Sequence, residues 1–476
     1  MASSPAALPD IEVCQRARLS RDGRFDGRFY IAVLTTGIFC RTTCPARMPA
    51  EENVRYYATI AAAQRAGYRP CKRCRPETSP TLPEWTLADD MVLRGVRLID
   101  AGYLNDHSVA ELAAELGVGA RQLSRLFAQN LGATPSAMAR ISRVRLAKQL
   151  LFNSNMPQAE VAFHAGYGSV SRFNSDIRAL FRAPPGALRA KKTIAPSPSV
   201  TLHLPVRPPY DHDWVFSYLQ RRQLPGVEEV SGAPGSWLYS RFLPDGVVRV
   251  SADAPGLRVE LPLVEEPIHS LLSRVRRVFD LGADGAVLHD TLALDQTLKP
   301  WVDARPGLRV PGAWHGFETA VRAILGQQVS VERGTVLAQQ MIERYGAGAF
   351  PGPAQLVDKE VAELGMPGRR GRAISLLARL YQAGELHLDE CGDYASVYAA
   401  LVALEGVGPW TANYIRMRVL KDPDAFPDND WVVLKQLGCT AAQARQRSVA
   451  WQPWRAYALM YIWYAAGQAR AQGAPD

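Results

Sequence analysis

The sequence lacks long apolar runs: no stretch of about eighteen consecutive apolar residues, the length of a membrane-spanning helix, occurs in its 476 residues. Its first residues, MASSPAALPD, lack the basic flank and the apolar stretch of a secretory signal. We therefore expect a cytoplasmic protein that has no membrane partner.

Cysteine is scarce and its number is odd, with seven residues in the chain. A reducing cytoplasm disfavours disulfides, so clustered cysteines are expected to bind metal. Cys14, Cys391 and Cys439 stand alone in the sequence, and we expect them to be ordinary core residues. The other four form a CxxxC pair and a CxxC pair.

These two pairs, Cys40 with Cys44 and Cys71 with Cys74, provide the four thiolates that Zn²⁺ accepts in tetrahedral geometry. We predict one Zn²⁺ ion at this site. Most four-cysteine sites only hold a small fold together, so the open question is whether one of these sulfurs is also reactive.

Acidic residues are outnumbered, since 46 Asp and Glu against 55 Lys and Arg give a net charge of +9. This charge favours a polyanionic partner, because lysine and arginine release condensed counterions on meeting phosphates. From Cys40 to Arg75 the only acids are Glu51 and Glu52, and the basic residues predict a surface that lies on phosphates. These basic residues are Arg41, Arg47, Arg55, Arg65, Arg69, Lys72, Arg73 and Arg75.

The length suggests about three domains of ordinary size. Segments 78–83 and 191–200 are rich in Pro, Ser or Thr and are typical of linkers. After the second linker, short alternating runs such as GVVRVSA and GLRVELPL predict a small antiparallel sheet, and alanine- and leucine-rich helical patterns follow. The fold class is therefore multidomain and α+β overall. The predicted parts are a zinc domain over 1–78, a helical domain over 84–190, an α+β subdomain over 201–295 and an all-helical lobe over 296–476.

An internal repeat at a spacing of 49 residues aligns AELAAELGVGARQLSRLF, from Ala110, with AEVAFHAGYGSVSRFN, from Ala159. In each copy a helical pattern ends at a glycine and a second helix follows, and Ser108 with Glu111 has the form of a capping box. The two units resemble the AraC-type DNA-binding domain, which places two recognition helices in successive major grooves. The residues expected to contact DNA are Arg121, Gln122, Arg125, Ser171, Arg172 and Asn174.

The string TTGIFCRTTCPAR, followed by ENVRYY and AGYRPCKRCRPE, closely resembles the N-terminal domain of the Ada adaptive-response family. The resemblance implies that Cys40 irreversibly accepts a methyl group from a DNA methylphosphotriester, and that Thr36 and Arg47 contact the DNA backbone. The zinc site would then be both structural and reactive. The PCHR string of the O6-alkylguanine repair domain of that family is absent, so that activity is not expected.

Electrostatics make this transfer plausible. Four thiolates on Zn²⁺ carry a net charge of about 2−, which repels a phosphodiester but not a neutral, methylated triester. Methylation of Cys40 removes one negative charge, so the affinity for DNA is expected to rise. A single repair event could then switch on the adjacent helix-turn-helix domain.

The string LEGVGPWTANYIRMR, residues 404–418, places a Gly-x-Gly turn between two expected helices. Such a helix-hairpin-helix can bind a DNA phosphate through backbone N–H groups, here near Gly406 and Gly408. With FETAVRAILGQQVSV, AFPDNDWVVLKQ and WQPWRAYALMYIWY, it resembles the AlkA-type 3-methyladenine DNA glycosylases. The resemblance implies a catalytic aspartate that faces the deoxyribose. Asp430 is the best match, and Asp428 is the alternative.

The same resemblance implies a pocket for a flipped base and a wedge, at Gln328, that fills the gap in the duplex. An N-alkylated purine is cationic and gains cation–π energy from electron-rich rings. It is already a good leaving group, so the enzyme mainly has to stabilise the oxocarbenium-like sugar with a carboxylate and admit water. Core packing is the alternative role of each ring. The matching aromatic residues are Trp410, Tyr414, Trp463 and Tyr464.

Two absences narrow the mechanism. Strand-cutting glycosylases carry a lysine just after the hairpin glycines, and this sequence has Trp410 there. Only Cys439 follows the hairpin, so the four-cysteine iron–sulfur cluster of related enzymes is excluded. We expect monofunctional excision of bases such as 3-methyladenine.

The sequence thus predicts an alkylation-response protein that binds alkylated and promoter double-stranded DNA. It would repair methylphosphotriesters, activate transcription with RNA polymerase as partner, and excise alkylated purines. One alternative is a DNA-binding regulator whose glycosylase-like part is inactive. Another is a zinc-dependent repressor that transfers no methyl group.

Overall fold

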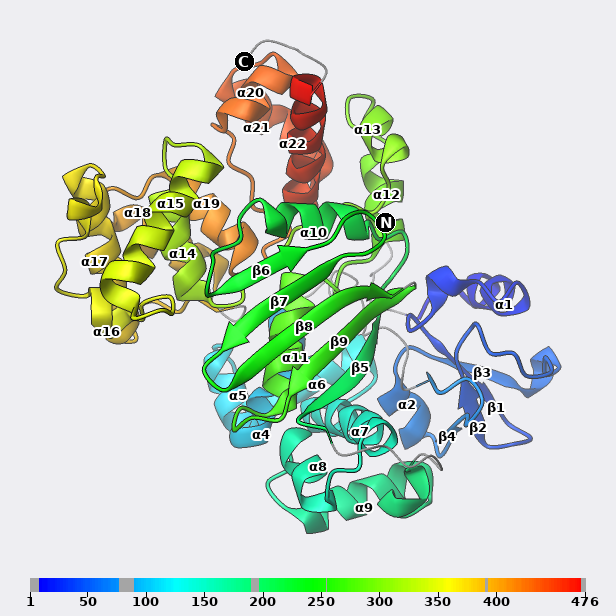
Figure 1. Ribbon diagram of the computed structural model, residues 1–476. Coiled ribbons are helices and arrows are strands. Elements are labelled where there is room, and N and C mark those ends of the chain that lie inside the picture. Colours follow the sequence, from blue (N-terminus) through cyan, green and yellow to red (C-terminus); the bar gives the residue numbers. More distant parts are fainter. Residues whose placement is uncertain (1–7, 77–89, 190–196, 254, 390–392, 472–476) are drawn as a thin grey trace. The chain divides into compact units, whose positions relative to one another are not determined.

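The structure is a computed structural model that describes residues 8–76, 90–189, 197–253, 255–389 and 393–471 (Figure 1). The chain forms two compact units, residues 1–207 with 253–273, and residues 208–252 with 274–476. The predicted linker 78–83 and residues 191–196 of the second linker lie outside the described residues. The four-domain division itself stays a prediction.

The end of the second predicted linker is wrong, because Ser199 and Val200 already belong to strand β5 (Ser199–Pro205). Along this strand Val200, Leu202 and Leu204 are buried and alternate with more exposed residues. That period of two is the pattern of a half-buried strand, and the Pro and Ser content of the segment concealed its start.

The N-terminal part of the first unit is built on a small four-stranded sheet in the order β3-β1-β2-β4. β1 is antiparallel to β2 and β3, whereas β2 and β4 run parallel. Ile31 and Val54 of the sheet pack with Phe29 and Cys14 into a compact core. The elements are α1 (Ile11–Leu19), η1 (Gly23–Phe25), β1 (Tyr30–Val33), β2 (Ile38–Cys40), η2 (Glu51–Asn53), β3 (Val54–Tyr57), α2 (Ile60–Arg65) and β4 (Arg69–Pro70).

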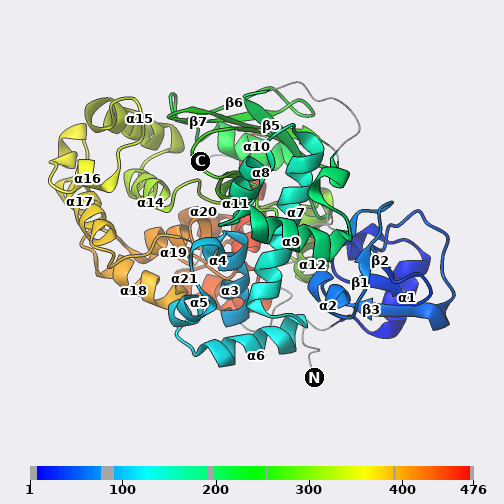
Figure 2. The same cartoon turned by 90° about the horizontal axis from the view of Figure 1, so that it is seen from below.

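The next part of the first unit is helical and contains both expected helix-turn-helix pairs, α5 with α6 and α8 with α9 (Figure 2). The predicted capping box is confirmed: Glu111 N–H donates to Ser108 Oγ, and Ser108 N–H donates to the Glu111 carboxylate. Gly117 and Gly166 adopt positive φ after the first helix of each pair. The elements are α3 (Asp90–Asp100), α4 (Tyr103–Asp106), α5 (Val109–Glu115), α6 (Ala120–Leu131), α7 (Pro135–Asn153), α8 (Gln158–His164), α9 (Val170–Phe181) and η5 (Pro185–Leu188).

Antiparallel strand pairs follow, as the alternating sequence predicted. In the first unit, β5 pairs with β9 (Gly256–Pro262), with Ser199 opposite Pro262. In the second unit, β7 (Leu238–Leu243) lies between β6 (Glu228–Ser231) and β8 (Gly246–Asp253) in a meander. The neighbouring helices are α10 (His212–Gln220) and α11 (Ile268–Val278).

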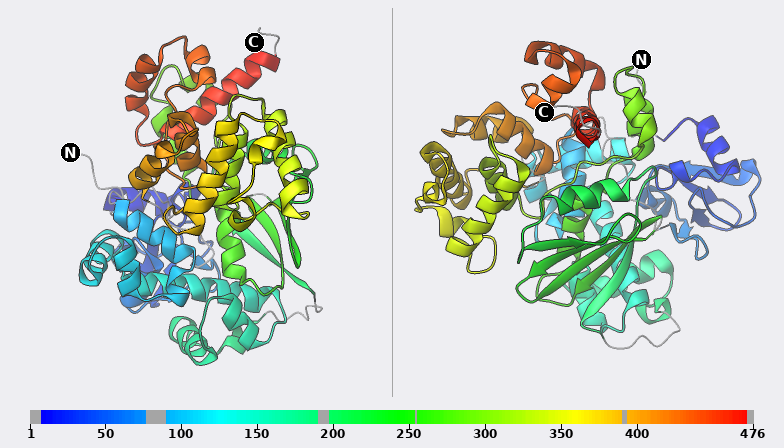
Figure 3. Two further views of the ribbon diagram at one scale, coloured as in Figure 1. Left: turned by 90° about the vertical axis from the view of Figure 1, so that its left-hand side faces the viewer. Right: turned by 45° about the horizontal axis from the view of Figure 1, so that its top comes forward.

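The rest of the second unit is helical, and no strand occurs within its described residues from 296 onward. Leu325 of α14, Leu377 of α17 and Ile415 of α19 share one apolar core. Figure 3 shows these helices from two further sides. They are α12 (Gly285–Leu292), α13 (Lys299–Ala304), α14 (Gly316–Leu325), α15 (Val331–Met341), the π-helical turn η6 (Ile342–Gly346), α16 (Pro353–Leu356), η7 (Val361–Leu364), α17 (Gly368–Gln382), α18 (Tyr394–Ala403), α19 (Pro409–Arg418), α20 (Trp431–Leu437), α21 (Ala441–Ser448), η8 (Val449–Trp451) and α22 (Arg455–Ala471).

Within the described ranges, no helix is both long and apolar enough to span a membrane.

Candidate functional site

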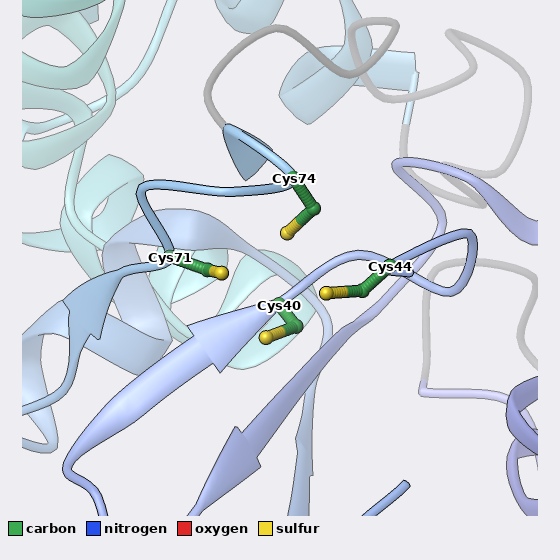
Figure 4. A group of neighbouring side chains, drawn as sticks. All are labelled: Cys40, Cys44, Cys71 and Cys74. Carbon is green, nitrogen blue, oxygen red and sulfur yellow. The ribbon is translucent and has the colours of Figure 1, made fainter. Parts of the chain in front are cut away.

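The four paired cysteines meet at one end of the small sheet (Figure 4). Cys40 ends β2, and the parallel pairing of β2 with β4 brings Cys71 beside it. The Cys71 N–H donates to the Phe39 carbonyl at 3.0 Å, which holds this approach. Cys44 and Cys74 lie in the segments that follow, and all four Sγ atoms are within 4.8 Å of one another.

This donor set fits a zinc ion. A tetrahedral site with Zn–S bonds of about 2.3 Å has sulfur–sulfur edges of about 3.8 Å, which is compatible with four Sγ atoms that all lie within 4.8 Å of one another. A hydrogen bond with Cys74 and burial raise the pKa of the Cys40 thiol, so these sulfurs resist ionising together without a cation. A divalent cation among them would reverse that resistance.

Two residues expected to contact DNA lie on the surface of the same small domain as the cysteine cluster. Thr36 is in the turn between β1 and β2, Arg47 is in the loop after Cys44, and both are exposed. Arg41, counted in the basic surface, instead forms an ion pair with Asp26. The count of charged residues from Cys40 to Arg75 did not include Asp26, because Asp26 precedes that range. The contacts of Thr36 and Arg47 with DNA stay predictions.

The isolated cysteines differ from one another. Cys14 is fully buried, and its thiol donates to the Pro9 carbonyl at 3.2 Å, so the core prediction is confirmed there. It is wrong for Cys439, which is half-buried because Gly438 ends α20 at positive φ and turns the chain toward the surface. Cys391 lies outside the described residues.

The residues expected to read DNA lie on the second helix of each helix-turn-helix pair. Arg121, Gln122 and Arg125 are exposed on α6, opposite the buried Leu123 and Phe127. On α9, Ser171 and Arg172 are exposed and Asn174 is half-buried, while Phe173 and Ile177 are buried. Their role in base recognition stays a prediction.

A Gly-rich turn joins α18 to α19. Gly406 has φ +95°, and a Cβ there would lie 2.8 Å from the Arg369 carbonyl oxygen, so only glycine fits. The Gln327 side chain donates to the Gly406 carbonyl and to Thr411 Oγ1, each at 3.0 Å. Gly408 is the N-cap of α19. The turn is therefore rigid. The first backbone N–H groups of α19, which follow Gly408, lie at its end.

Asp430 is the N-cap of α20, where its Oδ1 accepts the Val433 N–H at 2.9 Å. Two indole N–H groups also reach it: Trp410 Nε1 donates to Oδ2 at 2.7 Å, and Trp463 Nε1 donates to Oδ1 at 3.3 Å. The residue is only 5% exposed. Three elements, α19, α20 and α22, thus converge on one buried carboxylate.

Asp430 lines a cavity of about 840 Å³, which suits a small organic ligand. Trp410 and Tyr414 stack along one wall, with ring centroids 5.3 Å apart and an interplanar angle of 9°. Trp463 lies 6.4 Å from Tyr414, between centroids, and also lines the cavity. The exposed Gln328, in the loop between α14 and α15, lines it as well and has φ +53°.

Tyr464 does not line this cavity, contrary to the predicted base pocket. Its ring lies edge-on to Trp214 at 6.3 Å and under the Arg305 guanidinium. Successive residues of a helix point about 100° apart, so Trp463 and Tyr464 of α22 cannot both face one wall.

The alternative aspartate, Asp428, is separated from this cavity. It forms an ion pair with Arg445 of α21 and is not among the residues that line the cavity. The geometry therefore favours Asp430 over Asp428 as the carboxylate that meets a ligand.

Several residues that line the cavity were not predicted from the sequence, among them two aromatic residues and one arginine. Trp214 and Tyr218 come from α10, and Arg418 is the last residue of α19. Tyr218 is 200 residues away from Arg418, yet the Arg418 Nη1 donates to its hydroxyl at 2.7 Å. No local motif marks a residue that reaches the cavity from so far along the chain.

Three family models match the chain. The metal binding domain of Ada matches residues 13–77, a helix-turn-helix domain matches residues 112–191, and the AlkA N-terminal domain matches residues 201–315. The matches follow one another along the chain in the order that the motifs indicated.

Similar proteins combine these parts or contain some of them. A probable bifunctional transcriptional activator/DNA repair enzyme AlkA of Mycobacterium tuberculosis is 40% identical over 95% of this chain and 96% of its own length. DNA-3-methyladenine glycosylase 2 of Escherichia coli is 34% identical over 55% of this chain and 96% of its length. The bifunctional transcriptional activator/DNA repair enzyme Ada of Escherichia coli is 34% identical over 33% of this chain and 42% of its length.

A likeness of this extent, nearly end to end in both chains, defines the class of protein. The chain belongs to the AlkA family of bifunctional transcriptional activator/DNA repair proteins.

We predict that the purified chain holds one zinc ion and that Cys71→Ala loses most of it. Removal of one of the four ligands leaves the site incomplete. Because the free energy of metal binding stabilises the folded first unit, the melting temperature of that unit also falls. Elemental analysis with thermal unfolding checks both. Cys439→Ala is the matched control and keeps the zinc; loss of zinc in the control alone would contradict the site.

Proposed function

We propose that this chain couples the repair of alkylated DNA to the activation of transcription. Its near full-length likeness to a bifunctional AlkA protein supports DNA alkylation repair with transcriptional activation. The buried Asp430 in an aromatic-walled cavity carries the repair half of this proposal. The partners are alkylated and promoter DNA in the cytoplasm, and RNA polymerase during activation.

In the glycosylase reaction, a damaged purine flips from the duplex into the cavity and Asp430 faces its deoxyribose. Bond cleavage moves positive charge onto the sugar, and a fixed carboxylate nearby stabilises that charge. Because Trp410, Trp463 and Val433 already hold Asp430 in place, little reorganisation is needed during the reaction. Water then completes the hydrolysis.

The cavity walls suit the base. The stacked rings of Trp410 and Tyr414 offer electron-rich faces to a cationic purine such as 3-methyladenine, worth about 1–2 kcal/mol for a desolvated cation–π contact. Gln328, which lines the cavity and is exposed, fills the gap left in the duplex. The amides after Gly408 bind a phosphate of the same strand.

At the other end of the chain, the Cys40 thiolate attacks the methyl carbon of a DNA methylphosphotriester. The S–C bond forms as the C–O bond breaks, and the electron pair stays on the phosphate oxygen, which becomes an ordinary phosphodiester anion. Zn²⁺, when bound, keeps the sulfurs deprotonated at neutral pH. Thr36 and Arg47, both exposed, hold the DNA backbone.

Methylated Cys40 then raises DNA affinity, because one negative charge near the phosphates is gone. The helix-turn-helix residues on α6 and α9 supply promoter contacts that do not depend on this charge. The alternative, a regulator whose glycosylase-like part is inactive, is less favoured. DNA binding alone does not require a buried carboxylate that two indole N–H groups hold in a cavity. Release of free base from methylated duplex DNA tests the repair half of the proposal and separates it from this alternative.

We predict that Asp430→Asn reduces base excision by roughly 10²-fold or more while DNA binding persists, because the shape is kept and the charge is lost. Asp428→Asn is the matched control. Its partner Arg445 is exposed, so excision stays within about twofold of wild type. Single-turnover excision with a 3-methyladenine duplex gives the rates. A larger loss in Asp428→Asn than in Asp430→Asn would overturn the assignment.

The product should be an intact abasic strand that breaks only after alkali treatment. Trp410 occupies the place of a strand-cutting lysine and cannot form a Schiff base. Denaturing electrophoresis before and after alkali separates the two outcomes. Enzyme-dependent breaks without alkali, or trapping of a protein–DNA adduct by borohydride, would contradict monofunctional excision.

Incubation with methylphosphotriester DNA should add one methyl group to Cys40 and to no other cysteine. Peptide mapping by mass spectrometry locates the group, and unmethylated duplex of the same sequence serves as control. A methyl group on Cys44, Cys71 or Cys74, or on none of the four, would refute the transfer.

A further inference from the structure

The guanidinium of Arg418 is buried in the wall of the base cavity, with the residue only 7% exposed. Its Nε donates to the Pro311 carbonyl, and its Nη2 donates to the Gly312 carbonyl at 3.2 Å. Its Nη1 donates to the hydroxyls of Tyr218 and Tyr414, each at 2.7 Å. No carboxylate of the described residues forms an ion pair with it. A buried positive charge without a counter-charge is strongly unfavourable.

The two phenols are the groups that can supply the missing negative charge. Their oxygens lie 3.2 Å apart, so one hydroxyl can donate a hydrogen bond to the other oxygen. Arg418 is a donor only and already points at both oxygens. If Tyr414 is ionised, its oxygen accepts from Arg418 and from Tyr218, and every hydrogen bond of the cluster is satisfied.

The electrostatic surroundings assign the charge to Tyr414 rather than Tyr218. Burial raises the pKa of Tyr218, which keeps its proton. Burial also acts to raise the pKa of Tyr414, but the charges of Arg418 and Arg222 and the hydrogen bonds from Tyr218 and Arg418 outweigh it and lower that pKa to about 7.

The other charged groups that face Tyr414 each make contacts of their own. On α14, Glu318 and Arg322 pair with each other at 3.0 Å. On α20, the carboxylate of Asp430 accepts indole N–H groups. From α22, the neighbour of Tyr414 is the uncharged Trp463. From α10, Arg222 lies over the Tyr218 ring, 3.8 Å from its centroid.

We propose that Tyr414 presents a negatively charged oxygen to the base cavity, held by Arg418 and Tyr218, and that this charge selects cationic N-alkylated purines over neutral damaged bases. The inference rests on the proposed glycosylase function and adds a determinant of its substrate class. A neutral Tyr414 would leave the Arg418 charge to repel a cationic base. An ionised Tyr414 cancels that charge.

The charge acts on binding more than on bond cleavage. As the glycosidic bond breaks, positive charge leaves the base for the sugar, so the attraction of the base to Tyr414 weakens in the transition state. The selectivity therefore appears in the substrate concentration that half-saturates the enzyme. Because the phenol loses its proton as the pH rises through about 7, the preference for cationic bases grows from pH 6 to pH 8.

A spectroscopic titration of the whole protein tests the charge without any substrate. Tyrosinate absorbs in the near ultraviolet, and we expect one tyrosine of the wild type to ionise close to pH 7. The signal disappears in Tyr414→Phe, and its midpoint rises in Tyr218→Phe, which removes one donor to the oxygen. If no tyrosine of the wild type ionises below about pH 9, the inference is overturned, whether or not the variants fold.

Excision assays test the selectivity. Duplexes of one sequence carry either 7-methylguanine, which is cationic, or hypoxanthine, which is neutral, and hypoxanthine binding is measured by competition. We expect Tyr218→Phe to raise the half-saturating concentration of the 7-methylguanine duplex on the order of tenfold, with hypoxanthine binding nearly unchanged. Tyr461→Phe, another buried tyrosine of the second unit, serves as the control and changes neither.

Equal changes for the two duplexes, or no change for either, would overturn the selectivity. If the wild type releases neither base, the proposed function fails. The tyrosinate titration then still decides whether Tyr414 is charged, so the two failures can be told apart.

Discussion

The carboxylate of Asp430 is buried at the first turn of α20, where two indole N–H groups and one backbone N–H satisfy it. These hydrogen bonds also place Trp410 and Trp463, which form walls of the base cavity. The group that would stabilise the sugar and the rings that would hold the base are therefore positioned by the same contacts. A change at any one of the three residues is therefore expected to disturb both proposed functions of the cavity.

The two candidate centres, the cysteine cluster and the cavity at Asp430, both depend on negative charge that is partly or fully buried. In the proposed methyl transfer, thiolate charge at the cysteine cluster would exclude ordinary phosphodiesters and tolerate a neutral methylated triester. In the proposed glycosylase reaction, Asp430 would act on the sugar and Tyr414 on the base, each at a different moment. Alkylation adds positive charge to a purine and removes negative charge from a phosphate, so under this proposal both kinds of damage would be recognised by their change in charge.

The parts of the molecule that short spacings determine could be predicted from the sequence. The cysteine pairs, the two helix-turn-helix units and the capping box at Ser108 each depend on residues a few positions apart. Residues brought together from distant segments could not. Arg41 meets Asp26, and Tyr218 reaches Arg418 across 200 residues, and neither contact leaves a local pattern. The placement of Tyr464 in the base pocket was not met for a different reason. An aromatic composition does not show which side of a helix each ring faces.

The most direct test of the central claim uses the whole protein and one DNA sample. Duplex DNA treated with a labelled methylating agent carries both methylphosphotriesters and methylated purines, and a single incubation can follow label on protein and label in free base. The account predicts both signals, with the protein label reaching at most one methyl group per chain and the base release continuing over many turnovers. Release of no base, or base release that stops at one per chain, would contradict an enzyme that joins stoichiometric sensing to catalytic repair.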